Sequence, residues 1–243
     1  MSEPAGGRGF KPLGVKNYGS IGHLPNSRMG PSDHHVHEGQ AAICTIKPRD
    51  KHDVIIVTEK LDGSNCGVAL HQGGVLALGR AGYLAETSKF EQHQLFAEWV
   101  KSNEARFREL LVEGERCVGE WMAQAHGTRY TLPHEPFVIF DIMQGHRRAP
   151  WVELEQRCTY RGFILPRLIH KGIPVTVENV LRWLEPSGHG AIDAVEGAVW
   201  RVERKGDFDF MAKYVRPDKQ DGKYLPEISG GENVWNWRPS HDR

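Results

Sequence analysis

The stretch DVIIVTEKLDGSNCGVALHQGGVLALGR, residues 53–80, decides the fold that the sequence predicts. Its segments DVIIVTEK, NCGVALH and VLALGR are rich in β-branched and aliphatic residues, which is typical of strands. The Gly-Gly pair at residues 73–74 indicates a tight turn between the last two segments. The stretch therefore predicts two or three strands, and it places Lys60 at the end of the first one.

The rest of the chain adds helices and further strands to this unit. Apolar residues recur at near-helical spacing over residues 89–114, which predicts one or two amphipathic helices. The same kinds of pattern predict strands at RCVGEWMA, PFVIFDIM, AVEGAVWRVE and FDFMAKYVR, and a short helix at TVENVLRWLE. This order favours a mixed α+β fold with antiparallel sheets over the regular βαβ alternation of a doubly wound fold.

Composition limits the classes of protein that fit. The chain has 243 residues, and its 31 Lys+Arg balance its 31 Asp+Glu, which excludes a strongly cationic coat but not a local basic face. Its four cysteines form no CxxC pair, so neither a zinc knuckle nor a disulfide scaffold is indicated. No apolar signal core or long apolar run occurs, so we expect a cytoplasmic monomer without membrane contact.

Three parts are predicted along the chain. Residues 1–12 are rich in Gly and Pro and are expected to be a mobile tail. Residues 13–217 are expected to be one domain, whose first part, residues 13–50, is loop-rich. Residues 218–243 are expected to pack on this domain as an extension, with Trp235 and Trp237 docking it.

The segment EKLDGSN, residues 59–65, places a lysine between an apolar strand and a short polar turn. Such a lysine can be presented at the mouth of a cavity, where desolvation or nearby cations favour its neutral, nucleophilic form. An ordinary exposed lysine before a hairpin turn is the alternative, because short motifs recur by chance.

Carboxylates, an aromatic ring and a cation recur at the later predicted strands. They are Glu120 in VGEW, Phe140 in FVIFDI, Glu196 in VEGAVW and Lys213 in MAKYVR. Together with EKLDGSN, and in this order, these segments resemble the five ordered motifs of the covalent nucleotidyltransferases, which comprise RNA ligases, DNA ligases and mRNA capping enzymes. The resemblance is greatest to the phage-type, nick-sealing RNA ligases. The segment KNYGSIGHL at residues 16–24 also resembles the opening segment of that family.

This resemblance, which covers residues 16 to 217, implies a fold and an activity. The fold is an adenylyltransferase domain of two antiparallel sheets flanked by helices, with the ATP site between them. The activity is ATP-dependent joining of RNA 3′-hydroxyl and 5′-phosphate ends, in a duplex or structured context, through lysyl-AMP and an adenylated end. Mg²⁺ or Mn²⁺ would assist each displacement at phosphorus.

The resemblance also assigns roles to residues. Lys60 matches the lysine that takes AMP, and Lys213 matches a second catalytic lysine that contacts the α-phosphate. Glu196 matches a metal-binding carboxylate. The other matched positions contact the nucleotide or shape the loop around it: Glu59, Asp62, Asn65, Arg80, Glu120 and Phe140.

Some features leave alternatives open. The last motif commonly carries two lysines, but MAKYVR has only Lys213, so either Arg216 compensates or one phosphate contact is missing. Asp62 stands where many phage relatives have His and also occurs in DNA ligases. A DNA ligase, an enzyme that only adenylates ends, and a nucleotide- or RNA-binding module with a decayed site are therefore alternatives. The 27 residues after Arg216 are too few for the OB-fold domain of DNA ligases, which favours RNA.

A histidine cluster, DHHVH at residues 33–37, suggests a metal site. Its loop lacks the partner ligands of a structural zinc site, so a surface loop or a contact with the substrate end is the favoured interpretation of His34, His35 and His37.

Overall fold

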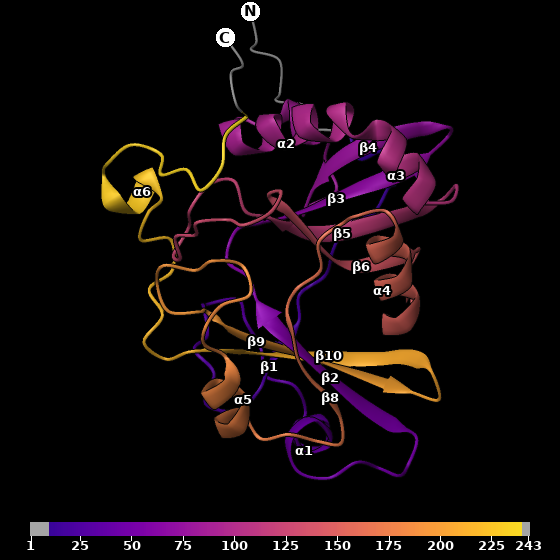
Figure 1. The fold of residues 1–243 in the computed structure, drawn as a ribbon, viewed down its shortest axis with the longest axis vertical. Coiled ribbons are helices and arrows are strands. Elements are labelled where there is room, and N and C mark those ends of the chain that lie inside the picture. The colour runs from indigo at the N-terminus through magenta and orange to yellow at the C-terminus, as the bar shows by residue number, and fades with distance from the viewer. Residues whose placement is uncertain (1–9, 240–243) are drawn as a thin grey trace, which may run out of the picture.

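The protein, a computed structural model, is described here over residues 10–239. The tail predicted at residues 1–12 falls outside this range apart from its last three residues. Figure 1 shows two sheets, one above the other, with most helices on their outer sides. This arrangement of two sheets flanked by helices confirms the predicted α+β fold.

Within residues 10–239 each sheet has five strands, and all neighbouring strands are antiparallel except β1 and β10. The first sheet, lower in Figure 1, has the order β1 (Gly22–His23), β10 (Asp207–Val215), β9 (Gly197–Arg204), β2 (Asp53–Lys60) and β8 (Leu168–Gly172). The second sheet has the order β4 (Gly74–Gly79), β3 (Ser64–His71), β5 (Glu115–Trp121), β6 (Phe137–Gln144) and β7 (Arg147–Arg148).

The chain crosses from one sheet to the other directly after Lys60. Strand β2 ends at Lys60 in the first sheet, and β3 begins at Ser64 in the second. The turn predicted between them is therefore a crossover and not a hairpin. Only glycine fits at residue 63, because a Cβ on Gly63 would lie 2.5 Å from the carbonyl oxygen of Trp121.

Helices cover the outer faces of both sheets. The second sheet is covered by α2 (Glu91–Ser102), α3 (Glu104–Leu110) and α4 (Trp151–Tyr160), and the short η1 (Ala85–Thr87) precedes α2. The first sheet is covered by α1 (Glu38–Thr45) and α5 (Val177–Trp183), and α6 (Pro226–Ser229) lies apart in the C-terminal segment.

The larger core lies between the second sheet and its helices. Phe96 and Trp99 lie one turn apart on α2, so they share a face, and their rings are 5.0 to 5.8 Å from those of Trp121 and Phe137. Burial of such a side chain contributes about 1.5 to 3 kcal/mol. The amphipathic pattern of residues 89–114 predicted one or two helices, and the structure has two there, α2 and α3.

Helices α1 and α4 were not predicted, and neither was the four-residue helix α6. Helix α1 lies in the segment expected to be loop-rich, and it is only eight residues long and buries just Ala41 and Cys44. Helix α4 follows Pro150, and its buried residues Trp151, Leu154 and Cys158 have a helical spacing that could have predicted it.

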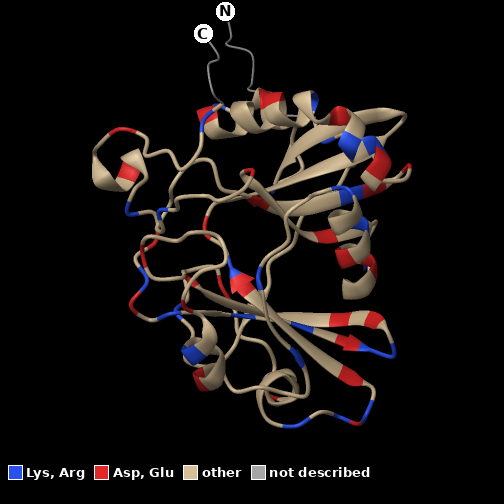
Figure 2. Cartoon of the chain, viewed as in Figure 1, with Lys and Arg blue, Asp and Glu red and all other residues tan. Residues whose placement is uncertain are grey.

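The C-terminal segment packs against the core of the second sheet through Trp235 and Trp237. Trp237 packs edge-on against Trp121 with ring centroids 5.8 Å apart, and Ala125 N donates to Val234 O at 2.8 Å. Charges of both signs are interspersed over both halves of the molecule in the view of Figure 2. Among residues 10–239, no helix combines the length and the apolar character needed to span a membrane.

Candidate active site

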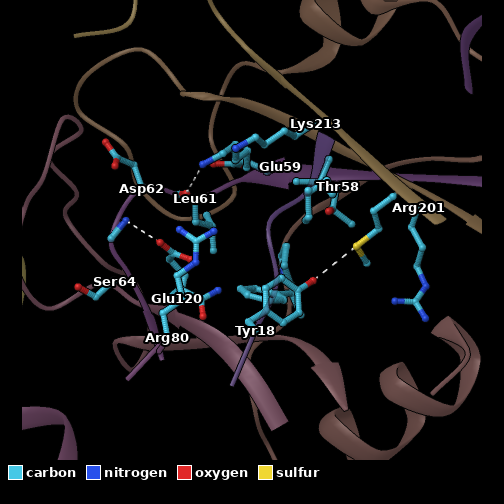
Figure 3. Close-up of a pocket in the computed structure, with 18 of the residues that line it drawn as sticks. Tyr18, Thr58, Glu59, Leu61, Asp62, Ser64, Arg80, Glu120, Arg201 and Lys213 are labelled. Atoms are coloured by element: carbon cyan, nitrogen blue, oxygen red, sulfur yellow. Dashed lines mark hydrogen bonds between the residues drawn. The ribbon is translucent and has the colours of Figure 1, made fainter. Parts of the chain in front are cut away.

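A cavity of about 460 Å³ lies between the two sheets and is lined by residues of both. Figure 3 shows side chains from β2, β3, β5 and β10 pointing into it. Most of the site residues predicted from the sequence line this cavity, although they are far apart in the chain: Glu59, Lys60, Asp62, Asn65, Arg80, Glu120, Phe140 and Lys213. The remaining one, Glu196, is in contact with Lys60.

Lys60 is held at the edge of the cavity by its neighbour across the sheet. Lys60 pairs with Gly197 in the register of β2 and β9, which brings the preceding residue, Glu196, beside it. Lys60 Nζ donates to Glu196 Oε2 at 2.5 Å and to Leu61 O at 3.3 Å. With its side chain 22% exposed, Lys60 is neither free in solvent nor sealed in the core.

Carboxylates dominate the electrostatics around this lysine. Burial alone lowers the pKa of Lys60, but the attraction of Glu196 and Glu120 outweighs it and the net shift is upward. Burial raises the pKa of Glu196 and raises that of Glu120 to about 7, even though Lys60 opposes both shifts. The carboxylates of the cavity therefore favour the protonated form of Lys60.

Glu120 also shapes the crossover after Lys60. Its Oε1 accepts a hydrogen bond from Gly63 N at 3.0 Å, which ties the crossover to β5 in the second sheet. The carboxylate of Asp62 is ion-paired with Lys219, with Nζ 2.5 Å from Oδ2. Lys219 was not predicted from the sequence, because nothing in its local pattern marks it.

Lys213 projects from β10 toward the same cavity and has an unpredicted carboxylate partner. Its Nζ lies 3.3 Å from Asp33 Oδ1, in the loop that contains the histidine cluster. Burial and the charge of Lys60 lower the pKa of Lys213. Met211, two residues earlier, lines the cavity where a second lysine was expected. Arg216 is ion-paired with Asp218 at 3.1 Å and does not line the cavity.

Phe140 and Tyr18 form an aromatic wall at one end of the cavity. Their rings meet edge to face with centroids 5.3 Å apart, and Phe140 is only half-buried. Tyr18 donates to Asp141 Oδ2 at 2.7 Å, and Asp141 also binds Arg148 and, at 2.8 Å, Arg201. This buried cluster joins the two sheets, because Asp141 belongs to one and Arg201 to the other.

Two lining residues carry polar groups without protein partners. Asn65 Oδ1 is buried and has no hydrogen-bond partner among the described residues. Arg80 is exposed, and its guanidinium forms no ion pair with any carboxylate of residues 10–239. These groups are suited to binding a polar ligand.

Glu59 lines the cavity but uses its carboxylate elsewhere. It accepts hydrogen bonds from Arg167 Nε at 3.2 Å and Gly188 N at 2.9 Å, and from Ser187 Oγ. Its carboxylate therefore fixes the loop at residues 187–188 and is not free for a ligand.

The histidine cluster has roles in the loop before α1. His37 precedes α1, and its backbone N donates to Gln40 Oε1 at 3.3 Å. His35 Nδ1 lies 3.3 Å from His23 O. Within residues 10–239, no three side chains of His, Cys, Asp or Glu are grouped as metal ligands would be.

Solved structures of RNA ligases are similar to this one. A Naegleria gruberi RNA ligase with PPi is 18% identical and has a TM-score of 0.54, over 94% of this chain and 64% of that chain. A lysine-to-alanine mutant of that ligase with ATP and Mn is 18% identical and has a TM-score of 0.54, over 80% of this chain and 58% of that chain. An archaeal ATP-dependent RNA ligase is 20% identical and has a TM-score of 0.43, over 68% of this chain and 43% of that chain.

The Naegleria structures share the fold of this chain, which spans between about half and two thirds of their length. A search of curated proteins found no significant match. The family model described as RNA ligase matches residues 53–215, which is most of the chain and includes both β2 with Lys60 and β10 with Lys213. The chain therefore belongs to the RNA ligase family.

Proposed function

We propose that this chain is an ATP-dependent RNA ligase that forms a covalent lysyl-AMP on Lys60. The observation that carries the proposal is the position of Lys60, which ends β2 in the cleft between the sheets with Glu196 and Glu120 close by. A lysine at the surface would have no such carboxylates to hold its charge and align its amine.

The cavity suits a nucleotide in size and chemistry. Its volume of about 460 Å³ is within the range of small-molecule sites. At one end, half-buried Phe140 offers a ring face on which a base can stack. Lys213 and Arg80 supply positive charge for phosphates. The ATP and Mn in the named Naegleria structure support this assignment.

The proposed reaction has three displacements at phosphorus. Lys60 Nζ loses a proton and forms a bond with the α-phosphorus of ATP, while the bond to pyrophosphate breaks. An oxygen of a 5′-phosphate end then attacks the same phosphorus and breaks its bond to Lys60. A 3′-hydroxyl finally loses its proton and attacks the 5′-phosphorus, and AMP leaves.

Glu196 and Glu120 are the two carboxylates that would hold a divalent cation beside Lys60. Removal from water raises the pKa values of the Glu196 and Glu120 carboxylates, so a second positive charge would stabilise both ionised forms. Bound Mg²⁺ or Mn²⁺ would neutralise charge that develops on the phosphate oxygens. Binding of the cation by Glu196 would also release Lys60 from its ion pair and favour its neutral form.

RNA is proposed as the joined strand, and a nicked duplex as the preferred substrate. The family match supports RNA, and the opening segment KNYGSIGHL supports the phage-type, nick-sealing subtype. A DNA ligase and an enzyme that only adenylates ends differ from this proposal in their products. Both differences are measurable on defined nicks.

The test is covalent labelling followed by sealing. Incubation with α-labelled ATP and Mg²⁺ should label the wild-type protein, whereas Lys60→Ala and Lys60→Arg should stay unlabelled. The labelled protein should then seal nicked duplexes whose nick is flanked by RNA. No label on the wild type would overturn the proposal, and equal sealing of all-DNA nicks would overturn the RNA assignment. Accumulation of adenylated ends without joining would identify an end-adenylating enzyme.

A further inference from the structure

The crossover after Lys60 is held by a lysine that lies 157 residues further along the chain. Lys219 Nζ contacts Asp62 Oδ2 at 2.5 Å and also hydrogen-bonds Thr128 Oγ1. The side chain of Lys219 is 6% exposed and that of Asp62 14%, so water screens this ion pair weakly. Lys219 is not among the residues that line the cavity, whereas Asp62 is.

Three distant segments meet at this ion pair without spare room. Gly127 N donates to Asp62 Oδ2 at 2.8 Å. A Cβ on Gly127 would overlap the carbonyl oxygen of Gln220 and come within 3.0 Å of both Asp62 and Lys219. Asp62 N in turn donates to Tyr130 Oη at 3.2 Å. The crossover is thus fixed through both the backbone and the side chain of Asp62.

The segment that carries Lys219 is itself anchored. Lys219 N donates to Arg216 O at 3.1 Å, just after β10, and Tyr224 N donates to His126 O at 2.8 Å. The Tyr224 hydroxyl donates to Asp193 at 2.9 Å. Lys219 is therefore presented from a segment attached at both ends, and its amine has a defined position.

The charge of Asp62 has two cations within electrostatic reach. Lys219 is its hydrogen-bonded partner, and Lys60 attracts it through space. Without Lys219, Asp62 would be a largely buried carboxylate without its ion-pair partner, and Lys60 is a cation that remains within electrostatic reach of it. The amine would then be drawn toward Asp62 and away from the position that Glu196 gives it.

We propose that Lys219 is a positioning residue for the adenylation step, because it neutralises and anchors Asp62 and so fixes the Lys60 amine for attack. The inference rests on the proposed function. It makes the C-terminal segment part of the active centre, and it predicts that Lys219 acts on the formation of lysyl-AMP more than on the later joining step, in which Lys60 is not the nucleophile.

The test compares single variants that remove this pair from either side. At saturating ATP, Lys219→Met and Asp62→Asn should each slow covalent labelling by about 10- to 100-fold, the size of effect that a misplacement near 1 Å produces. The ATP concentration for half-maximal labelling should change by less than about threefold, since neither change removes a predicted phosphate contact. Lys219→Arg should restore part of the rate. Lys223→Met is the matched control, because Lys223 lies on the same segment and pairs with Asp193.

Two further measurements separate positioning from a loss of folding. The variant with both Lys219→Met and Asp62→Asn should label at a rate within about threefold of the slower single variant, because both changes remove the same interaction. Sealing of a strand that already carries AMP should persist in Lys219→Met, which a misfolded protein could not do. If the wild type is labelled and Lys219→Met is labelled at the same rate, this inference alone is overturned. The same holds if Lys219→Met loses labelling and the sealing of an already adenylated strand to the same extent. No label on the wild type would overturn the proposed function instead.

Discussion

The side-chain amine of Lys60 lies 2.5 Å from Oε2 of Glu196, across two neighbouring strands of one sheet. Since a protonated lysine is not a nucleophile, this contact opposes the loss of the proton that the proposed attack on ATP requires. The same carboxylate thus holds Lys60 in place and sets the condition for its use.

Metal removal should therefore stop labelling of Lys60. Chelation should abolish the covalent label, and added Mg²⁺ or Mn²⁺ should restore it. Glu196→Ala should label about 100-fold more slowly than wild type at saturating metal, a typical loss for one group that stabilises charge during reaction. Labelling by α-labelled ATP over a metal titration checks this. Glu178→Ala, at an exposed ion pair on α5, should behave as wild type, and a normal rate for Glu196→Ala would contradict the metal role.

Phe140 should determine how tightly the nucleotide binds. Phe140→Ala should raise the ATP concentration for half-maximal labelling by about 5- to 100-fold, because stacking on a base contributes about 1 to 3 kcal/mol. Phe140→Tyr keeps a ring and should change this concentration by less than about threefold. Equal half-saturation for Phe140→Ala and wild type would show that the base lies elsewhere.

Gly63→Ala should disturb the active centre through the backbone alone. The added methyl group would meet the carbonyl oxygen of Trp121 at 2.5 Å, so the crossover must shift and carry Lys60 with it. We expect labelling to fall by at least about tenfold. Gly79→Ala is the control, because a Cβ there has no neighbour within 4 Å. Equal labelling by both variants would show that the crossover tolerates displacement.

The buried cluster at Asp141 should contribute strongly to stability. Arg201→Met leaves Asp141 with one cation fewer inside the protein, and breaking a buried pair in this way costs about 3 to 5 kcal/mol. The measurement is the free energy of unfolding by urea. Arg182→Met is the control. It removes the ion pair of Arg182 with Glu178, whose side chains are 66% and 75% exposed, and should change this free energy by less than about 1 kcal/mol. Similar losses in both variants would contradict the role of the cluster.

Acid should destabilise the fold through a pair of histidines. His189 Nε2 accepts from Arg167 N at 3.0 Å, and its Nδ1 lies 2.8 Å from His134 Nε2, so His189 must donate there as a neutral ring. Burial first, and then the charges of His134 and Arg167, lower the pKa of His189 from 6.5 to about 4.

Because the unfolded chain binds this proton more readily, stability should be fully present above pH 6.5 and fall as the pH drops toward 4. Between pH 7 and pH 5, His189 should account for about 2 kcal/mol of lost unfolding free energy. In urea unfolding at the two pH values, the free energy of unfolding of His189→Asn should fall by about 2 kcal/mol less than that of the wild type. Parallel losses in the two proteins would place the acid sensitivity elsewhere.

Local patterns predicted the parts of the fold that depend on neighbouring residues. Strand β2 and helices α2 and α3 follow from β-branched runs and from helical spacing of apolar residues. Helix α1 was missed because a short helix that buries two small side chains gives little periodic signal. The division of β2 and β3 between two sheets also has no local signal, since a crossover and a hairpin turn use the same residue types.

The site shows the same limit. Lys60, Phe140 and Lys213 were predicted because each lies in a recognisable motif, and the structure places all three around one cavity. Lys219 and Asp33 were not, because their roles depend on contacts with residues 157 and 180 positions away. Such contacts are set by the packing of whole segments, which no pattern around either residue encodes.

The three-residue crossover after β2 has a mechanical consequence. It is the shortest covalent link between the two sheets in the described chain, and Lys60 stands at its beginning. Any opening or closing of the sheets around a nucleotide must therefore rotate the backbone next to this lysine. Under the proposed function, a change in the angle between the sheets would therefore also change the direction of the Lys60 amine.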